Sequence, residues 1–165
     1  MADDRSELRV FIDANILIAG SVWPRWPYEV LQHAARGDFQ PVLTPYVIEE
    51  ARRTLLALFP GEIGRFDAFL ASCRIEVTEN PTADAVAAHI DLVRDPTDVP
   101  VALAAILAGV DCLVSEDKDL TVRDKSTARL RRQVAVYISG TFLREVMGWS
   151  TEQLEAARSR MWQDL

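Results

Sequence analysis

The chain has 165 residues, which predicts a single domain long enough to bury a sizeable hydrophobic core. Hydrophobic residues make up 49% of the sequence and charged residues 26%, so the composition is that of an ordinary globular protein. The net charge of −7 argues against a protein whose whole surface binds nucleic acid, although a local basic strip is compatible with it.

The start of the chain, its longest apolar run and its cysteines argue against a membrane protein, a secreted protein and a disulfide-rich protein. The chain starts with acidic and polar residues, so no secretory signal is expected there. The longest apolar run, Val99–Val110, is too short to cross a bilayer and predicts a buried helix. The two cysteines form no C-x-x-C pair, so no zinc site or disulfide framework is indicated. We therefore expect a soluble, cytoplasmic protein without membrane contact.

The first predicted strand, Val10–Ile12, is an apolar run that ends abruptly at Asp13. In open α/β sheets, ligands bind beyond the carboxyl ends of the strands, which is where Asp13 lies. Asn15 follows two residues later. The alternative is that Asp13 or Asn15 only caps the next helix, and on this segment alone the cap is the better explanation.

The next elements are predicted from turn residues and apolar spacing. They are a loop over Gly20–Pro27, a helix over Tyr28–Arg36, a strand over Pro41–Leu43 and a helix from Thr44 to about Phe59. Within that last helix, Glu49 lies nearly opposite the apolar stripe and can pair with Arg53, so we expect it to be solvated. Glu50 lies on the flank of the stripe without a basic partner and is the better site candidate.

Three elements are predicted between residues 62 and 93, and a loop follows them. They are a short helix over Glu62–Ser72, a strand over Arg74–Thr78 and a helix from Pro81 to about Val93. The loop, Arg94–Val101, places Asp98 at the start of an apolar helix, Val99–Ala108. Asp98 either caps that helix and faces its dipole or contributes to a site, and taken alone the cap is at least as well supported.

The last third of the chain combines acids at a strand end with a basic segment. A short buried strand, Cys112–Ser115, is followed by Asp117 and Asp119. Lys118 and Arg123 lead into the most basic segment, Asp124–Gln133, which includes Lys125. This segment is either a solvated loop or a cationic rim that suits a phosphate backbone. The final predicted elements are a strand over Val134–Ile138, a short helix over Ser139–Gly148 and a helix from Ser150 to Trp162.

Strands and helices alternate throughout, which predicts an α/β fold with a mostly parallel sheet and helices on both faces. Such a sheet brings the acids at strand ends and helix starts to one edge. Carboxylates gathered there cannot all stay ionised without a cation, and Mg²⁺ or Mn²⁺ suits oxygen ligands. Such an ion can activate water and stabilise the charge on a phosphodiester. No Walker loop, dinucleotide-binding turn or nucleophile elbow is present.

Three segments, FIDANILIAG, TPYVIEEARRTL and DPTDVPVALAAILAGVDCLVSEDKDL, resemble a PIN-domain nuclease in their order and spacing. The resemblance covers roughly residues 8–143 and is greatest to the VapC-type toxins of bacterial toxin–antitoxin pairs. It implies a three-layer α/β/α sandwich and metal-dependent cleavage of RNA. It also implies a homodimer that a small antitoxin protein holds inactive.

The resemblance assigns a role to several residues. Its four acids, expected to be catalytic and to ligate Mg²⁺ or Mn²⁺, are Asp13, Glu50, Asp98 and Asp117. Glu49 is the alternative to Glu50 after a one-residue slip, and Asp95 is the alternative to Asp98. Asn15 and Ser115 match supporting positions, and Asp119 is either an outer ligand or the direct ligand in place of Asp117.

The sequence therefore predicts a metal-dependent endoribonuclease. Lys118, Arg123 and Lys125 are the candidates for contacts to the RNA backbone. The predicted nuclease domain is residues 1–148, and residues 149–165 form a helical extension that packs on the domain or on a partner. The first alternative is a non-catalytic PIN-like module that binds RNA or protein. The second, an aspartate-based phosphoryl-transfer domain, ranks low because Asp13-Ala-Asn15 lacks the second Asp of its D-x-D pattern.

Overall fold

The structure is a computed structural model that describes residues 8–165. The acidic start of the chain, for which we expect no secretory signal, lies outside the described residues. The strands are β1 (Arg9–Ile12), β2 (Gln40–Leu43), β3 (Glu76–Val77), β4 (Cys112–Val114) and β5 (Ala135–Tyr137). They form one sheet in the order β3-β2-β1-β4-β5, and every neighbouring pair is parallel.

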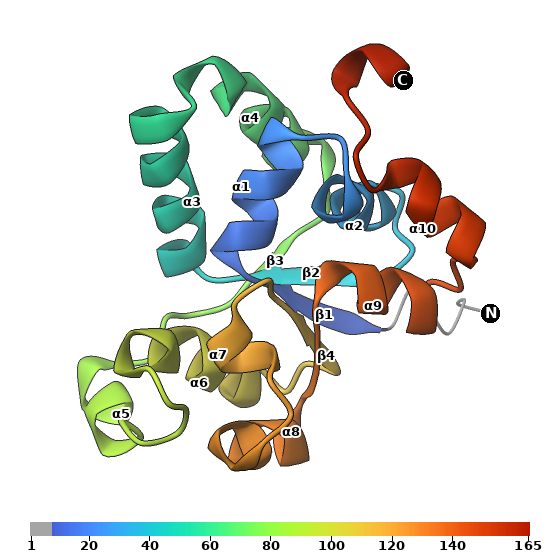
Figure 1. The fold of residues 1–165 in the computed structure, drawn as a ribbon. Helices are drawn as coiled ribbons and strands as arrows, with labels where there is room; N and C mark the ends of the chain where they lie inside the picture. Colours follow the sequence, from blue (N-terminus) through green and yellow to red (C-terminus); the bar gives the residue numbers. More distant parts are fainter. Residues whose placement is uncertain (1–7) are drawn as a thin grey trace, which may run out of the picture.

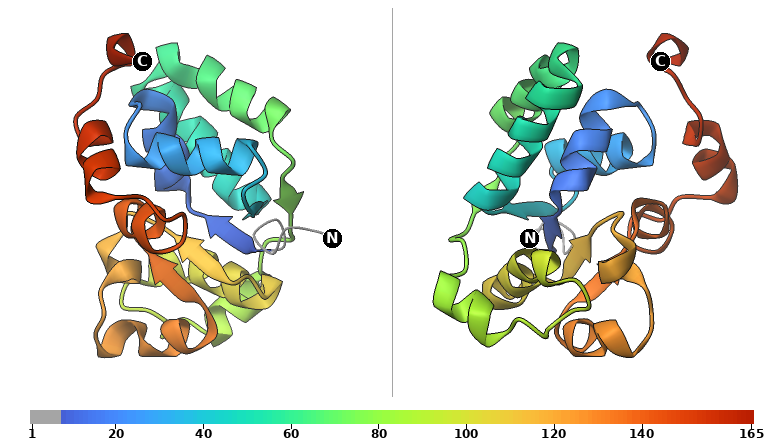
Figure 2. Two further views of the ribbon diagram at one scale, coloured as in Figure 1. Left: turned by 90° about the vertical axis from the view of Figure 1, so that its right-hand side faces the viewer. Right: turned by 60° about the vertical axis from the view of Figure 1, so that its left-hand side comes forward.

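Helices cover both faces of this sheet (Figures 1 and 2). On one face lie α1 (Ala14–Val22), α2 (Trp26–Ala35), α3 (Pro45–Leu58) and α4 (Ile63–Ser72). On the other lie α5 (Ala83–Ala88), α6 (Val99–Ala108) and α8 (Ala128–Gln133). The prediction of an α/β/α sandwich with a mostly parallel sheet is confirmed.

The remaining elements are shorter. The helix α7 (Lys118–Thr121) follows β4, and α9 (Ser139–Glu145) packs on α2, with α10 (Thr151–Ala157) beside it. The 3₁₀ turns are η2 (Pro60–Glu62), η3 (Pro96–Asp98), η4 (Lys125–Thr127) and η5 (Trp162–Asp164). Within residues 8–165, no helix is long and apolar enough to span a membrane.

The central strand β1 sits in the middle of the core and sets the position of the site. Phe11 pairs with Val42 on β2 and with Leu113 on β4, and all three side chains are fully buried. A strand that is buried on both faces has a continuous apolar sequence, as the prediction from Val10–Ile12 assumed. The strand ends at Asp13, where the backbone N–H still donates to the Val114 carbonyl of β4 at 3.1 Å.

The predicted loop over Gly20–Pro27 is wrong at both ends, because α1 continues to Val22 and α2 begins at Trp26. Pro27 lies in the first turn of α2, where its missing N–H leaves no hydrogen bond unmade. Gly20 allows close helix packing rather than a turn, since an added Cβ would lie 2.5 Å from Cδ1 of Leu31.

The helix predicted from Pro81 to about Val93 is too long, because α5 ends at Ala88. The His89 N–H reaches the carbonyls of both Ala85 and Val86, so the last turn tightens and the helix stops. For the basic segment Asp124–Gln133, one of the two predicted alternatives is a solvated loop. The segment instead contains η4 and α8.

The C-terminal helix was predicted to reach Trp162 but ends at Ala157. Beyond it, tertiary contacts override the helical pattern. The Arg160 side chain donates from Nε to the Pro24 carbonyl at 2.7 Å, and the Trp162 indole donates to the Val22 carbonyl at 2.9 Å. Both contacts tie the end of the chain to the α1–α2 connection, while the division of the chain at residue 148 stays a prediction.

Candidate functional site

The site begins where β1 and β4 end side by side at the carboxyl edge of the sheet. Asp13 follows β1, and Ser115 follows β4. Both side chains are buried, and the Ser115 hydroxyl donates to Oδ2 of Asp13 at 2.7 Å. The parallel pairing of the two strands therefore brings residues 102 positions apart into direct contact.

Ser115 connects the acids of this edge through its single oxygen. Besides donating to Asp13, Oγ accepts the backbone N–H of Asp117 at 3.0 Å and the Asn15 amide at 3.1 Å. Oδ1 of Asn15 in turn accepts the Glu116 N–H at 3.0 Å. Asn15 thus links the start of α1 to the turn after β4, and it does not cap the helix. The cap of α1 is Asp13, whose Oδ1 accepts the Ala14 N–H at 2.7 Å.

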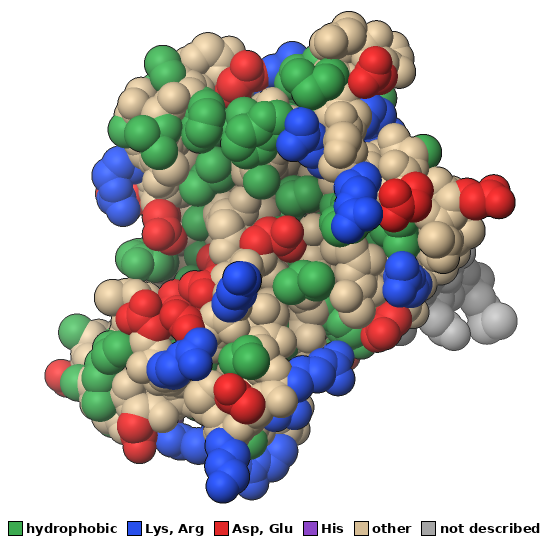
Figure 3. All heavy atoms as spheres, viewed as in Figure 1, with side chains coloured by type: hydrophobic (Ala, Val, Ile, Leu, Met, Phe, Trp, Pro, Cys, Tyr) green, Lys and Arg blue, Asp and Glu red, His purple; other side chains and the backbone are tan. Residues whose placement is uncertain are grey.

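Two helices bring further acids to the same place. Glu50 comes from α3 and Asp98 from the start of α6, and with Asp13 and Asp117 they surround a cavity of about 190 Å³. The cavity is lined by Asp13, Ala14, Asn15, Ile18, Tyr46, Glu50, Thr97, Asp98, Val101 and Asp117. In the surface view, acidic side chains gather in the hollow between the upper and lower groups of helices (Figure 3).

The two glutamates of α3 are separated by the structure. Glu50 lines the acid cavity and is half-buried. Glu49 is exposed and faces a shallow hollow beside Arg52 and Arg53. Glu49 is therefore solvated, as its position opposite the apolar stripe predicts, and Glu50 lies at the flank of the stripe.

Asp98 occupies the N-cap position of α6 without making the capping hydrogen bond. Its Oδ2 is buried and has no hydrogen-bond partner among the described residues. A buried carboxylate oxygen without a partner is costly unless a cation or a proton satisfies it. The side chain therefore does not cap α6 by a hydrogen bond, and Asp98 is a member of the cavity lining.

Burial raises the pKa of two of these acids above the ordinary value of an aspartate. Burial raises the pKa of Asp13 to about 6, although the hydrogen bonds from Ser115 and Ala14 lower it. Burial, and next the neighbouring Asp117 carboxyl, raise the pKa of Asp98 to about 7. Carboxyl groups with a raised pKa in a shared cavity are typical of a site that binds a positive charge.

A divalent cation fits this donor set. The four acids offer only carboxylate oxygens, which hard ions such as Mg²⁺ and Mn²⁺ prefer. Asp98 also belongs to a second group, in which one oxygen each of Asp95, Asp98 and Asp119 lie within 4.8 Å of one another.

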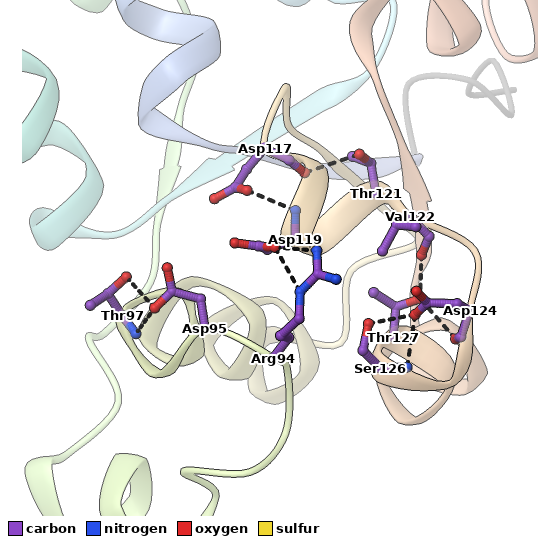
Figure 4. A network of polar contacts seen from close by, with 10 residues as sticks. All are labelled: Arg94, Asp95, Thr97, Asp117, Asp119, Thr121, Val122, Asp124, Ser126 and Thr127. Carbon is purple, nitrogen blue, oxygen red and sulfur yellow. Dashed lines mark hydrogen bonds and ion pairs between the residues drawn. The ribbon is translucent and has the colours of Figure 1, made fainter.

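The other two members of that second group already have partners (Figure 4). Oδ1 of Asp95 accepts the N–H and the hydroxyl of Thr97 at 2.9 and 2.8 Å, and these bonds lower the pKa of Asp95. Oδ1 of Asp119 forms an ion pair with Arg94. Neither carboxylate lines the acid cavity. Asp117 does line it, which distinguishes Asp117 from Asp119.

Sequence reasoning missed one aromatic member of the cavity, Tyr46, which lies one helical turn before Glu50 on α3. Burial, and next the Glu50 charge, raise the pKa of the Tyr46 phenol. The spacing of four residues on a helix could have identified it, because such residues share a face. Among the remaining unpredicted members, Ala14, Ile18 and Val101 give the cavity an apolar wall beside its acids, and Thr97 is polar.

The predicted basic residues lie outside the acid cavity. Lys118 and Arg123 border a neighbouring groove of about 570 Å³ that also includes Tyr137 and Ile138. Lys125 lies on η4 and is exposed. The structure thus places two of the three residues along one groove beside the turn that carries Asp117.

Comparisons with known proteins identify the family and the fold. The family model described as PIN domain matches residues 9–119, which is more than half of the chain. PAE2754 from Pyrobaculum aerophilum is similar in structure, with a TM-score of 0.59 and 18% sequence identity over 86% of this chain and 97% of that chain. VapBC2 from Rickettsia felis, solved bound to a DNA fragment from its promoter, has a TM-score of 0.55 and 14% identity over 79% of this chain and 98% of that chain. No curated protein matches the sequence.

Proposed function

Because the chain belongs to the PIN-domain family, we propose that it is a metal-dependent ribonuclease that hydrolyses phosphodiester bonds in RNA. The proposed ligands of Mg²⁺ or Mn²⁺ are the four acids of the cavity, Asp13, Glu50, Asp98 and Asp117. The observation that supports this most strongly is the convergence of four carboxylates on one cavity, one of which, Asp98, has a buried Oδ2 without a partner among the described residues.

The chain's own residues supply orientation and shape. When bound, a divalent ion would polarise the phosphate and lower the pKa of water. Ser115 and Asn15 hold the Asp13 carboxylate, and Ser115 also fixes the backbone before Asp117. Hydrogen bonds to the carboxylate of a metal ligand orient that ligand. The cavity volume of about 190 Å³ is below that of a drug-sized ligand pocket, so it suits a phosphodiester group rather than a whole nucleotide.

We further propose that the protein is the toxin of a bacterial toxin–antitoxin pair and acts in the cytoplasm. The sequence resemblance to VapC-type toxins and the structural likeness to VapBC2 from Rickettsia felis support this assignment. A small antitoxin protein is then the expected partner, and a homodimer is the expected assembly. We propose that the RNA backbone contacts Lys118, Arg123 and Lys125. These side chains are exposed and positively charged, so they attract the negative phosphates of the RNA.

The test compares cleavage of a single-stranded RNA by the full chain with Mg²⁺, with Mn²⁺ and with a chelator. We expect cleavage that requires a metal ion. The variants Asp98→Asn and Glu50→Gln should lower the rate by at least about 100-fold, because removing even a residue that only hydrogen-bonds to a metal ligand lowers metal affinity or activity by about 10- to 100-fold.

Glu49→Gln is the matched control, since it removes an adjacent glutamate of the same helix that faces away from the cavity. It should cleave RNA at the wild-type rate. Chelator-resistant cleavage, or equal losses in Glu49→Gln and Glu50→Gln, would contradict the proposed site. RNA binding without any cleavage by the wild type would support the non-catalytic alternative instead.

A further inference from the structure

Arg94 is a basic residue that contacts an acid beside the cavity, and the predicted RNA contacts did not include it. Its guanidinium donates from Nε to Oδ1 of Asp119 at 2.9 Å, and Nη2 donates to the same oxygen (Figure 4). An oxygen of Asp119 lies within 4.8 Å of oxygens of Asp95 and Asp98. The guanidinium is therefore separated from Asp98 by a single carboxylate.

The ion pair leaves part of the guanidinium available. Nη1 of Arg94 has no hydrogen-bond partner among residues 8–165, and the side chain is 55% exposed. A guanidinium has five N–H donors in a planar fork, so it can bind a carboxylate on one edge and a phosphate on another. Asp119 also restricts the long side chain, so less entropy is lost when Arg94 binds a second group.

A cation at this place would reduce the electrostatic repulsion between the substrate phosphate and the acids of the cavity. The substrate phosphate must approach a cavity lined by four carboxylates in a protein of net charge −7. A bound divalent ion offsets only part of that repulsion, because the ionised carboxylates of the cavity and the phosphate all carry negative charge. In the surface view, basic side chains lie directly beside the acidic ones in the hollow (Figure 3).

Other basic residues are less well placed for this role. Lys118 and Arg123 border the neighbouring groove, and among the described residues neither forms an ion pair with an acid of the cavity or of the second acid group. Arg129 on α8 also forms an exposed Arg–Asp pair, but its partner is Asp91, which is not in the acid cavity or the second acid group. Arg94 thus combines exposure, a fixed position and proximity to Asp98.

We propose that Arg94 binds a phosphate oxygen of the RNA strand next to the scissile bond, and that Asp119 positions Arg94 rather than ligating the metal ion. This inference rests on the proposed ribonuclease function and adds to it a phosphate-binding residue at the rim of the cavity. It also explains why the second acid group contains a carboxylate whose charge is already paired.

The experiment measures KM and kcat for a single-stranded RNA, together with binding of the same RNA at several salt concentrations. Binding is measured with Mg²⁺ in the Asp13→Asn background, where we expect no cleavage. Arg94→Gln should raise KM about 10-fold with a smaller change in kcat, the effect of losing one charge-assisted hydrogen bond. It should also reduce the slope of log K against log[salt] by about 0.7, as expected for one lost contact to a single-stranded phosphate.

Companion variants separate binding from structure. Arg94→Lys should keep the salt slope and recover part of the KM, because it keeps the charge. Asp119→Asn should keep the slope and raise KM, because Arg94 loses its support but not its charge. Arg129→Gln, the matched control, should change neither quantity.

Two outcomes overturn the inference in distinguishable ways. If the wild type cleaves RNA and Arg94→Gln keeps the wild-type KM and salt slope, the role of Arg94 is wrong while the proposed function stands. If the wild type cleaves no RNA with either metal ion, the proposed function fails and this inference fails with it.

Discussion

The buried carboxyl of Asp13 should make the metal-free protein less stable as the pH rises, and Asp13→Asn should remove most of that loss. The pKa of Asp13 rises from an ordinary 3.8 to about 6, chiefly because the side chain is buried. The native state therefore binds more protons than the unfolded chain between these two values. Stability is unaffected below pH 3.8, falls as the pH rises through the folded pKa, and stays low above it.

The size of the loss follows from the same two values. A pKa raised from 3.8 to about 6 corresponds to about 3 kcal/mol of unfolding free energy once the group is fully ionised. Asp98, whose pKa rises to about 7, extends the fall towards neutral pH. Its side chain is only half-buried, so solvent screening makes its contribution smaller than its pKa alone implies.

The assay is urea unfolding of the full chain at several pH values between 4.5 and 8, with a chelator present. Three acids have a lowered pKa, namely Asp38, Asp95 and Asp124. They do not affect the unfolding free energy in this pH range, because their effect appears only when the pH falls below the ordinary pKa of an aspartate. Asp84→Asn, which changes an exposed acid on α5, is the control and should keep the wild-type pH dependence.

Adding Mg²⁺ should restore more stability at pH 8 than at pH 5, because a cation binds the ionised carboxylates and a proton competes with it. A wild-type unfolding free energy that is flat from pH 4.5 to pH 8 would refute the reasoning. An unchanged slope in Asp13→Asn would refute the assignment of the slope to this residue.

Two further predictions concern packing and support. Ser115→Ala should destabilise the protein by about 1–3 kcal/mol in urea unfolding, because Oδ2 of Asp13 loses the buried hydroxyl donor at 2.7 Å; an effect below 0.5 kcal/mol would mean that another donor replaces it. Gly140→Ala should also destabilise the protein, by about 1–3 kcal/mol, because the new Cβ would lie 2.8 Å from the Trp26 ring. Gly64→Ala, which meets no atom within 4 Å, should instead stabilise it by about 0.5 kcal/mol, and equal effects of the two glycine variants would contradict the packing argument.

The convergence of the cavity acids could be predicted because it follows from local patterns and one topological rule. Asp13 ends a buried strand, Glu50 lies on the flank of a helical stripe, and Asp98 precedes an apolar helix. Parallel strands place their carboxyl ends at one edge, so the acids after them meet without any knowledge of distances. The same rule does not predict which atoms of these residues are in contact.

Apart from Tyr46, which lies one helical turn before Glu50, the site contacts that sequence reasoning missed join residues far apart in the chain. Ser115 meets Asp13 across 102 residues, and Arg94 meets Asp119 across 25. The helix after Ser150 stops early because Arg160 binds the Pro24 carbonyl. Periodicity and turn composition describe a residue's neighbours along the chain, so they cannot find partners that only the folded chain brings together.

The choice between a helix cap and a metal ligand could not be made from sequence, because both roles use the same residue type at the same position. In the structure the two roles are not alternatives for Asp13, since a carboxylate has two oxygens. Oδ1 accepts the Ala14 N–H as a cap, while Oδ2 accepts the Ser115 hydroxyl on the side of the site. Asp98 sits at a cap position and makes no cap bond, so its buried Oδ2 is left for another partner. What decides a carboxylate's role is therefore the number of donors that reach each oxygen, which is a property of the fold.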